Sequence, residues 1–231
     1  MNAEKMRWFS KERLPVALML ALTFSTGVSD AVGYLGLDRV FTGNMTGNVV
    51  ILGMALAGAS NLSVLGPLVG LFSFLLGAFA AGRIVRSSPA QWTVRNTIAF
   101  GTAGLIMFLT AVLMWLQPGS VEKPWSFLMT AMLAFSMGTQ AGAARHLGVT
   151  DVNTVVVTST LIGLAADSKF SSGRGQLWAR RILSVTLIGL GAVTGSILLQ
   201  VHLALGVALS AAIIFSVALV GHQSMPSKSY N

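Results

Sequence analysis

Apolar runs of membrane-spanning length alternate with short polar segments along this chain. An α-helix needs about 20 consecutive apolar residues to cross the hydrocarbon core of a bilayer. Runs of this kind occupy residues 14–36, 64–85, 96–116, 125–144, 182–200 and 203–221. The pattern predicts an all-α integral membrane protein with six full transmembrane helices.

Two further apolar segments are interrupted by polar residues, so we expect both to form re-entrant or broken half-helices. Residues 40–57 read V-F-T-G-N-M-T-G-N-V-V-I-L-G-M-A-L-A, and residues 150–167 read T-D-V-N-T-V-V-V-T-S-T-L-I-G-L-A-A-D. Asn48 and Thr158 are good N-cap residues for the helix that follows each break. A helix starting at Asn48 and ending at Ala59 would rise about 18 Å, roughly half of the ~30 Å hydrocarbon core.

The distribution of Arg and Lys favours re-entry of both segments over full crossing. If they enter and leave by the same face, the basic N-terminus, the 83–95 loop, Arg145 and the 169–181 loop all lie on the cytoplasmic side. Full crossing, with eight spans, would place the 83–95 loop outside and is the alternative.

The re-entrant arrangement gives the chain three parts. Residues 1–13 form a cytoplasmic head, residues 14–221 form a single transmembrane domain, and residues 222–231 form a polar tail. Both termini are then cytoplasmic.

The two halves of the chain resemble each other. A shift of 110 residues places Asp30-Ala31 on Gln140-Ala141 and Asn48 on Thr158. With three full spans in each half, the halves (about 14–116 and 125–221) would be inverted relative to one another. Chance similarity among apolar helices is the competing explanation.

Polar groups in the two broken segments form the candidate solute site. A half-helix presents free N–H groups and a partial positive charge at mid-membrane, which favours an anion or the carbonyl edge of a neutral polar solute. In transporters built this way, the substrate lies where the discontinuous helices meet. Alternatively, these groups only cap helices and hold neighbouring spans together. The candidate substrate-binding residues are Asp30, Thr42, Asn44, Thr46, Gly47, Asn48, Gln140, Asn153, Thr154 and Thr158.

Asp30 is the strongest single candidate for a functional residue, because placing a charge at mid-membrane costs roughly 2.5–3.5 kcal/mol on insertion scales. We expect it to couple protons or bind a cation, with Gln140 as its neutral counterpart in the second half. The alternatives are an acid hydrated near the outer surface or one paired with Arg39. Asp151 and Asp167 bracket the second broken segment and are interpreted as boundary residues.

Composition excludes several functions. Hydrophobic residues make up 54% of the 231 and charged residues 10%, far from the balance of a soluble domain. The net charge of +8 is explained by cytoplasmic loops, so we expect no nucleic-acid partner. There is no cysteine, and the three scattered histidines match no metal-ligand spacing. We therefore expect no metal, no cofactor and no enzymatic activity.

Small residues recur on several spans. Gly66 and Gly70 form one pair at helical spacing, and Gly191 and Gly195 form another. Such pairs let helix backbones approach closely, so we interpret them as packing positions within the chain. Formation of a homo-oligomer through these faces is the alternative.

These motifs resemble the YoaK-like family of bacterial and fungal polytopic membrane proteins, which are grouped under a domain of unknown function. The resemblance rests on Asp30-Ala31, V-F-T-G-N-M-T-G-N at residues 40–48, M-G-T-Q-A at 137–141 and T-V-V-V-T at 154–158. It covers residues 14–221 and departs at Gly142-Ala143, where an Asn is expected. The resemblance implies a multi-pass inner-membrane protein of bacterial type and no particular activity.

The sequence thus predicts a secondary transporter or channel-like permease for a small polar or anionic solute, with the solute and the lipid bilayer as its partners. A structural or accessory membrane subunit without a solute path is the alternative.

Overall fold

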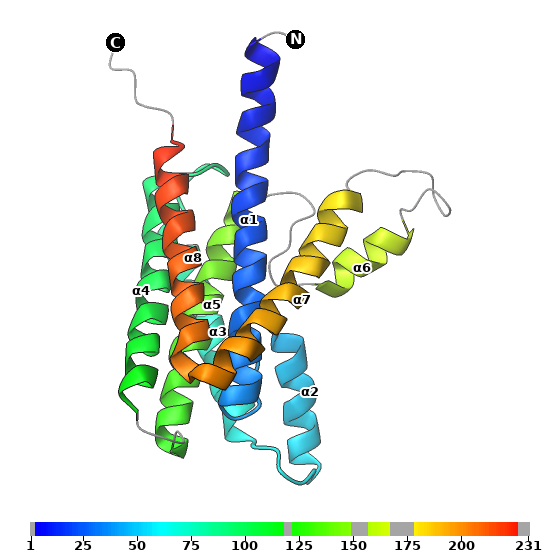
Figure 1. Cartoon of the computed structure of the whole chain (residues 1–231), viewed down its shortest axis with the longest axis vertical. Coiled ribbons are helices and arrows are strands. Elements are labelled where there is room, and N and C mark those ends of the chain that lie inside the picture. Colours follow the sequence, from blue (N-terminus) through cyan, green and yellow to red (C-terminus); the bar gives the residue numbers. More distant parts are fainter. Residues whose placement is uncertain (1–2, 118–121, 149–156, 167–177, 226–231) are drawn as a thin grey trace.

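The chain folds into a bundle of α-helices (Figure 1). The computed structural model describes residues 3–117, 122–148, 157–166 and 178–225, and within these ranges it contains helices and no strand. The all-α prediction is confirmed. The helices are α1 (Ala3–Gly36), α2 (Met45–Leu56), α3 (Leu65–Val85), α4 (Val94–Leu116), α5 (Lys123–Leu147), α6 (Val157–Ala166), α7 (Trp178–Val201) and α8 (Leu203–Gln223).

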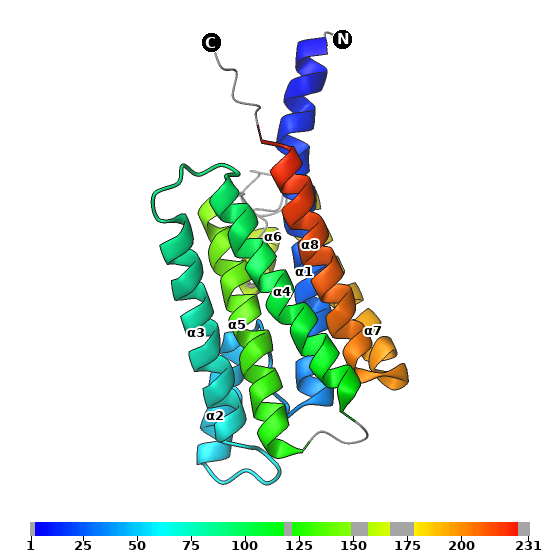
Figure 2. The same cartoon turned by 90° about the vertical axis from the view of Figure 1, so that its left-hand side faces the viewer.

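Four helices form the centre of the bundle and two long helices flank it. Helices α1, α4, α5 and α8 pack on one another, while α3 packs along α5 and α7 packs along α1. Figure 2 shows α3 and α7 at opposite edges of the molecule. The most apolar part of α1 is 78% buried inside the molecule, whereas those of α3 and α7 are 22% and 17% buried. The outer helices therefore offer most of their surface to the surroundings.

The core is filled by large side chains from the central helices. Met19 and Leu22 of α1 meet Phe100 of α4, Leu133 of α5 and Ile214 of α8, and all five are almost fully buried. At about 25 cal/mol per Å² of apolar surface, such side chains are the main source of cohesion wherever water would otherwise reach them. Elsewhere the bundle relies on close packing.

Glycines bring the flanking helices into backbone contact with the central ones. A Cβ on Gly27 of α1 would overlap the carbonyl oxygen of Ile188 on α7, and one on Gly191 of α7 would overlap the carbonyl of Phe24 on α1. The α3–α5 pair repeats this crossing, with glycines on both helices facing a carbonyl of the other. The predicted packing role of Gly191 is confirmed.

Five described helices are long and apolar enough to cross a membrane: α1 from Leu14 onwards, α3, α4, α7 and α8. The sixth predicted span corresponds to α5, whose 25 residues would rise about 37 Å. Its hydropathy is lowered by polar side chains that it buries against its neighbours, among them Ser136, Thr139 and Gln140. A central position explains that composition, because these groups are turned away from lipid.

The two short helices differ in detail from the prediction. Helix α2 begins at Met45 after a non-helical segment, so Asn48 lies inside the helix and the predicted N-cap role of Asn48 is wrong. Helix α6 begins at Val157, which places Thr158 inside the helix as well. Figure 1 shows α2 beside the lower part of α1, running to the end of the bundle opposite the start of α1.

Candidate functional site

The carboxylate of Asp30 holds the backbone that leads into α2. Asp30 lies in the last two turns of α1 and is 9% exposed. Its Oδ1 accepts hydrogen bonds from the backbone N–H of Thr42 at 2.8 Å and of Gly43 at 2.6 Å, and from the Thr42 hydroxyl at 3.2 Å. Charge-assisted bonds of this kind are stronger than neutral ones. One buried side chain therefore fixes two successive peptide groups of the non-helical segment.

Asn48 holds the same segment from the opposite side. Its Oδ1 accepts from the Phe41 backbone N–H at 2.9 Å, and its Nδ2 donates to the Phe41 carbonyl at 2.7 Å. The side-chain amide thus pairs with both polar groups of one residue, as a neighbouring β-strand would. Asn48 is 1% exposed. Its role is to supply hydrogen-bond partners to the N–H and carbonyl groups of non-helical backbone that is shielded from water. Such groups need a partner within the protein.

The cap of α2 is Asn44. Its Oδ1 accepts from the Gly47 N–H at 3.1 Å, an arrangement that satisfies one of the free donors at a helix start. The amides of Thr42, Gly43 and Gly47 consequently have partners inside the protein. The prediction that these groups are free to bind a solute is wrong for these three amides.

Arg39 turns the chain between α1 and this segment. Its φ of 54° lies in the left-handed region, which is uncommon for a residue with a side chain. Arg39 itself is exposed, and in the described part of the chain no Lys or Arg nitrogen lies within 4 Å of the Asp30 carboxylate. The alternative of an Asp30–Arg39 ion pair is not supported.

Glycines on two spans make room for the segment. A Cβ on Gly33 would lie 2.6 Å from the Val40 carbonyl oxygen, and a Cβ on Gly70 of α3 would lie 2.8 Å from the Val40 side chain and 3.2 Å from Asn48 Nδ2. Gly43 is tight in the same way, with the Thr26 methyl group at 3.0 Å. The segment is therefore wedged between α1 and α3, and Gly70 serves its fit rather than contact between two spans.

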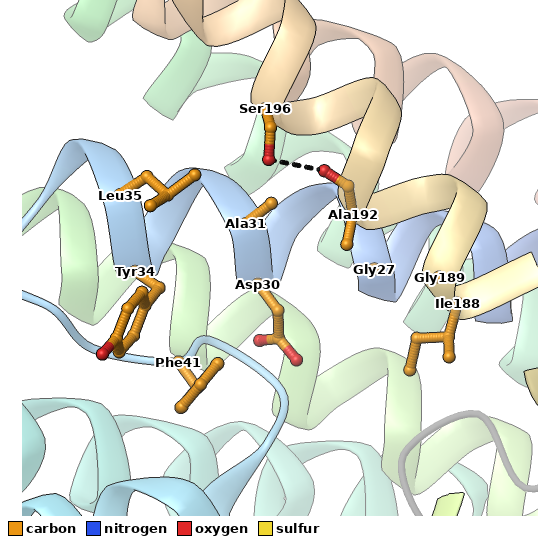
Figure 3. A pocket seen from close by; sticks show the side chains of 10 residues that line it. All are labelled: Gly27, Asp30, Ala31, Tyr34, Leu35, Phe41, Ile188, Gly189, Ala192 and Ser196. Atoms are coloured by element: carbon orange, nitrogen blue, oxygen red, sulfur yellow. Dashed lines mark hydrogen bonds between the residues drawn. The ribbon is translucent and has the colours of Figure 1, made fainter.

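A cavity of about 380 Å³ adjoins Asp30 (Figure 3). Helices α1 and α7 form its walls, and Phe41 closes one side. Figure 3 shows the Asp30 carboxylate pointing into the space between Phe41 and Ile188. Apart from the carboxylate, the lining is mainly aliphatic and aromatic. The lining residues are Gly27, Asp30, Ala31, Tyr34, Leu35, Phe41, Ile188, Gly189, Ala192 and Ser196.

Gln140 lies deep in the bundle on α5. It is fully buried, and its Nε2 donates to the Thr26 hydroxyl at 3.3 Å, one turn of α1 before Asp30. Its Oε1 is a buried oxygen without a hydrogen-bond partner in the described structure. Three other buried side-chain atoms of the described residues, on Asp38, Asn96 and Thr130, also lack a partner, so this feature does not single out Gln140.

The structure brings only some of the predicted site residues together. Asp30, Thr42, Gly47 and Asn48 cluster around the segment, Asn44 caps α2 at its exposed start, and Gln140 reaches Thr26 rather than Asp30. Thr46 and Thr158 are exposed on their helices. Asn153 and Thr154, like Asp151 and Asp167, lie outside the described residues.

Sequence reasoning did not find the other residues that line the cavity, among them Tyr34, Phe41 and the Ile188–Ser196 face of α7. The face of α7 contains small and aliphatic residues with a single hydroxyl, so it carries no polar signal.

Comparison with known proteins identifies the family. The family described as "Protein of unknown function (DUF1275)" matches residues 18–220, nearly the whole chain. The chain belongs to this family. A relative of the DUF1275 chain, the "UPF0700 transmembrane protein YoaK" of Bacillus subtilis (strain 168), is 34% identical over 151 residues. That match spans 65% of each protein, slightly less than two thirds of the relative's length.

No solved structure matches the DUF1275 chain. The resemblance to YoaK-like proteins is confirmed. The relative is named a transmembrane protein, and the five long apolar helices of the described chain indicate a multi-pass membrane protein.

Proposed function

We propose that this DUF1275 chain is a small secondary transporter or channel-like permease whose solute site is the Asp30 cavity. One observation carries the proposal. A buried carboxylate and a non-helical segment meet at the wall of an open cavity between α1 and α7 of a membrane protein. Ionisable groups within membrane spans are rare and usually mark solute or ion pathways. Irregular backbone at that depth is tolerated where it is buried in protein or lines a cavity, and both descriptions apply here.

The packing of the helices supports an inverted internal repeat. Exchanging α1 with α5, α2 with α6, α3 with α7 and α4 with α8 turns each helix contact into another observed contact: α1–α7 becomes α5–α3, and α2–α3 becomes α6–α7. The glycine crossings follow the same exchange, with Gly27 and Gly191 corresponding to Gly138 and Gly77. Repeats of this kind place the solute between two half-helices.

The proposed topology has six full spans, with both re-entrant elements returning to the face they entered from and both termini in the cytoplasm of an inner membrane. Single cysteines can test it, because the native chain has none. Cysteines at Gly36 and Ser60 should both react with a membrane-impermeant thiol reagent from outside, and one at Ser88 should react only from inside. If Gly36 and Ser60 react from opposite sides, the first segment crosses the membrane fully.

The solute path is tested by adjacent positions on α7. Ala192 lines the cavity, whereas Val193 is 56% exposed and turned away from it. For a permease we expect Ala192→Cys to react with a water-soluble thiol reagent much faster than Val193→Cys. Equal resistance at both positions would mean that water does not enter the cavity.

Transport itself is measured as uptake of labelled polar, anionic and cationic solutes by proteoliposomes. Uptake should be lost in Asp30→Asn and reduced in Asn48→Ala, because both side chains hold the wall of the cavity. Gly82→Leu is the control, since a Cβ there meets no atom within 4 Å and the residue lies on α3, which does not line the cavity. Uptake that is unchanged in both site variants would remove the proposed site.

A non-transporting accessory subunit is the second candidate, and one observation favours it. The backbone amides of Thr42, Gly43 and Gly47, which were predicted to bind a solute, donate hydrogen bonds to Asp30 and Asn44 instead. In that case the polar residues serve only to hold the segment. This alternative predicts a dry cavity in the cysteine experiment and no uptake of any solute.

A further inference from the structure

We infer that the Asp30 cavity takes an organic cation with an apolar body, such as a substituted amine, rather than an anion. The inference names the solute class of the proposed permease and rests on that function for its physiological meaning.

Among the residues that the structure describes, the Asp30 carboxylate has no cationic partner. No Lys or Arg nitrogen of the described chain lies within 4 Å of it. The hydrogen bonds from Thr42 and Gly43 all end on Oδ1. A carboxylate accepts about four hydrogen bonds over its two oxygens, so Oδ2, which accepts none of these three bonds, has capacity left for a guest. Neutral donors lower the cost of burying the charge, but a cation beside it would lower that cost much further.

The walls of the cavity suit an apolar body. Ala31, Ile188 and Ala192 contribute alkyl surface, and Tyr34 stacks on Phe41 with ring centroids 4.9 Å apart and planes inclined by 22°. Aromatic faces attract cations as well as apolar groups. The volume of about 380 Å³ lies in the lower part of the range for small-molecule sites. The cavity therefore fits one small amphipathic molecule.

The polarity of the cavity also sets the orientation of the guest. Leu35 and Tyr34 are 57% and 37% exposed, whereas Asp30 is 9% exposed. The open side is thus formed by apolar and aromatic surface, and the charge lies deeper. The guest would enter with its cationic group toward Asp30 and its apolar group against Tyr34 and Leu35.

Other solute classes fit less well. An anion would meet the Asp30 carboxylate, and the amides that could have offset the repulsion are already bonded to Asp30 itself. This carboxylate therefore takes up the amides of the non-helical segment just before α2. A strongly polar neutral solute would leave its hydrogen-bonding groups unpaired against alkyl walls, which is unfavourable.

The test is binding of benzyltrimethylammonium to the purified full chain in detergent, measured by equilibrium dialysis with radiolabelled probe. This ion is permanently charged and combines one aromatic ring with one cationic group. Asp30→Asn removes the charge. Gly189→Leu adds bulk to the cavity wall on α7 and leaves the Asp30 carboxylate in place, and a Cβ at Gly189 meets no atom within 4 Å. Gly82→Leu makes the same exchange on α3, where a Cβ is equally free, and serves as the control.

We expect saturable binding by the wild type and by Gly82→Leu, and at least about tenfold weaker binding by Asp30→Asn and Gly189→Leu. Benzoate at equal concentration should not compete. Absence of cation binding, equal binding by all four proteins, or displacement by benzoate would each overturn the inference. Gly189→Leu keeps the test valid even if Asp30→Asn does not fold.

The two proposals fail in different ways. Cation binding without uptake in proteoliposomes would refute the permease and leave a cation-binding membrane protein. Asp30-dependent uptake of an anion or neutral solute, without cation binding, would refute the cation and leave the permease.

Discussion

Replacing Asn48 with alanine tests whether a single side chain holds the non-helical segment in place. Asn48 makes two short hydrogen bonds to one residue, from Phe41 N at 2.9 Å and to Phe41 O at 2.7 Å. Alanine removes both bonds and leaves the Phe41 N–H and carbonyl without those partners. The helix itself does not suffer, because alanine is the best helix former.

The expected loss follows from the groups left unpaired. A fully buried donor or acceptor without a partner costs about 1–3 kcal/mol. Phe41 is partly buried, so its two groups together cost at most about 6 kcal/mol. Asn44→Ala is the matched control, because this asparagine occupies the same G-N dipeptide four residues earlier and makes one cap bond at an exposed site. Loss of such a cap costs about 1 kcal/mol.

The free energy of unfolding can be measured by titrating mixed micelles with a denaturing detergent and following intrinsic tryptophan fluorescence. Asn48→Ala should destabilise the protein clearly more than Asn44→Ala. Asn48→Asp should be at least as damaging as alanine, because it keeps an acceptor for Phe41 N–H but sets an anion against the Phe41 carbonyl. Equal stability of Asn48→Ala and Asn44→Ala would refute the reasoning.

Three further predictions concern helix packing and buried polar groups. Gly138→Ala should strongly destabilise the fold, because its Cβ would overlap a carbonyl oxygen on α3. Gly101→Ala, whose Cβ meets no atom within 4 Å, should stabilise the fold by about 0.5–1 kcal/mol in the same assay. Similar effects of the two substitutions would contradict the packing. Gln140→Leu should leave the free energy of unfolding unchanged or raise it, because one long hydrogen bond and an unpaired oxygen are removed together. A decrease of more than about 2 kcal/mol would show that Oε1 has a partner. Asp30→Leu should expose the 40–44 segment to proteolysis in detergent, since the Thr42 and Gly43 amides lose their acceptor, and resistance equal to wild type would contradict the anchoring role.

The break before the first half-helix could be predicted from local sequence, but the functions of its two asparagines could not. The pattern T-G-N occurs twice between residues 42 and 48, so Asn44 and Asn48 are equally good N-caps by local preference. Tertiary contacts decide between them. Gly70 of α3 leaves space for the Asn48 amide, and Phe41 supplies its partners, so the helix begins one turn earlier. Nothing within the segment encodes that choice.

Long spans were predictable because apolar runs of the right length have few other interpretations. Which helices contact each other could not be predicted. A glycine such as Gly27 indicates that another backbone comes close, but it does not identify the helix to which that backbone belongs. Asp30 was identifiable as unusual from its type and position alone. Its partners were not, because they are backbone amides, which every residue except proline carries.

The crossed pairing of α1 with α7 has a consequence for biosynthesis. Asp30 finds its amide partners 12 and 13 residues later, so this contact can form while the chain is still emerging from the ribosome. The partner surface around Gly191 is translated more than 150 residues after Gly27. Until then, lipid or an insertion factor must cover the face of α1 around Gly27. Nascent chains that stop before α7 should therefore be favoured substrates for membrane quality-control proteases.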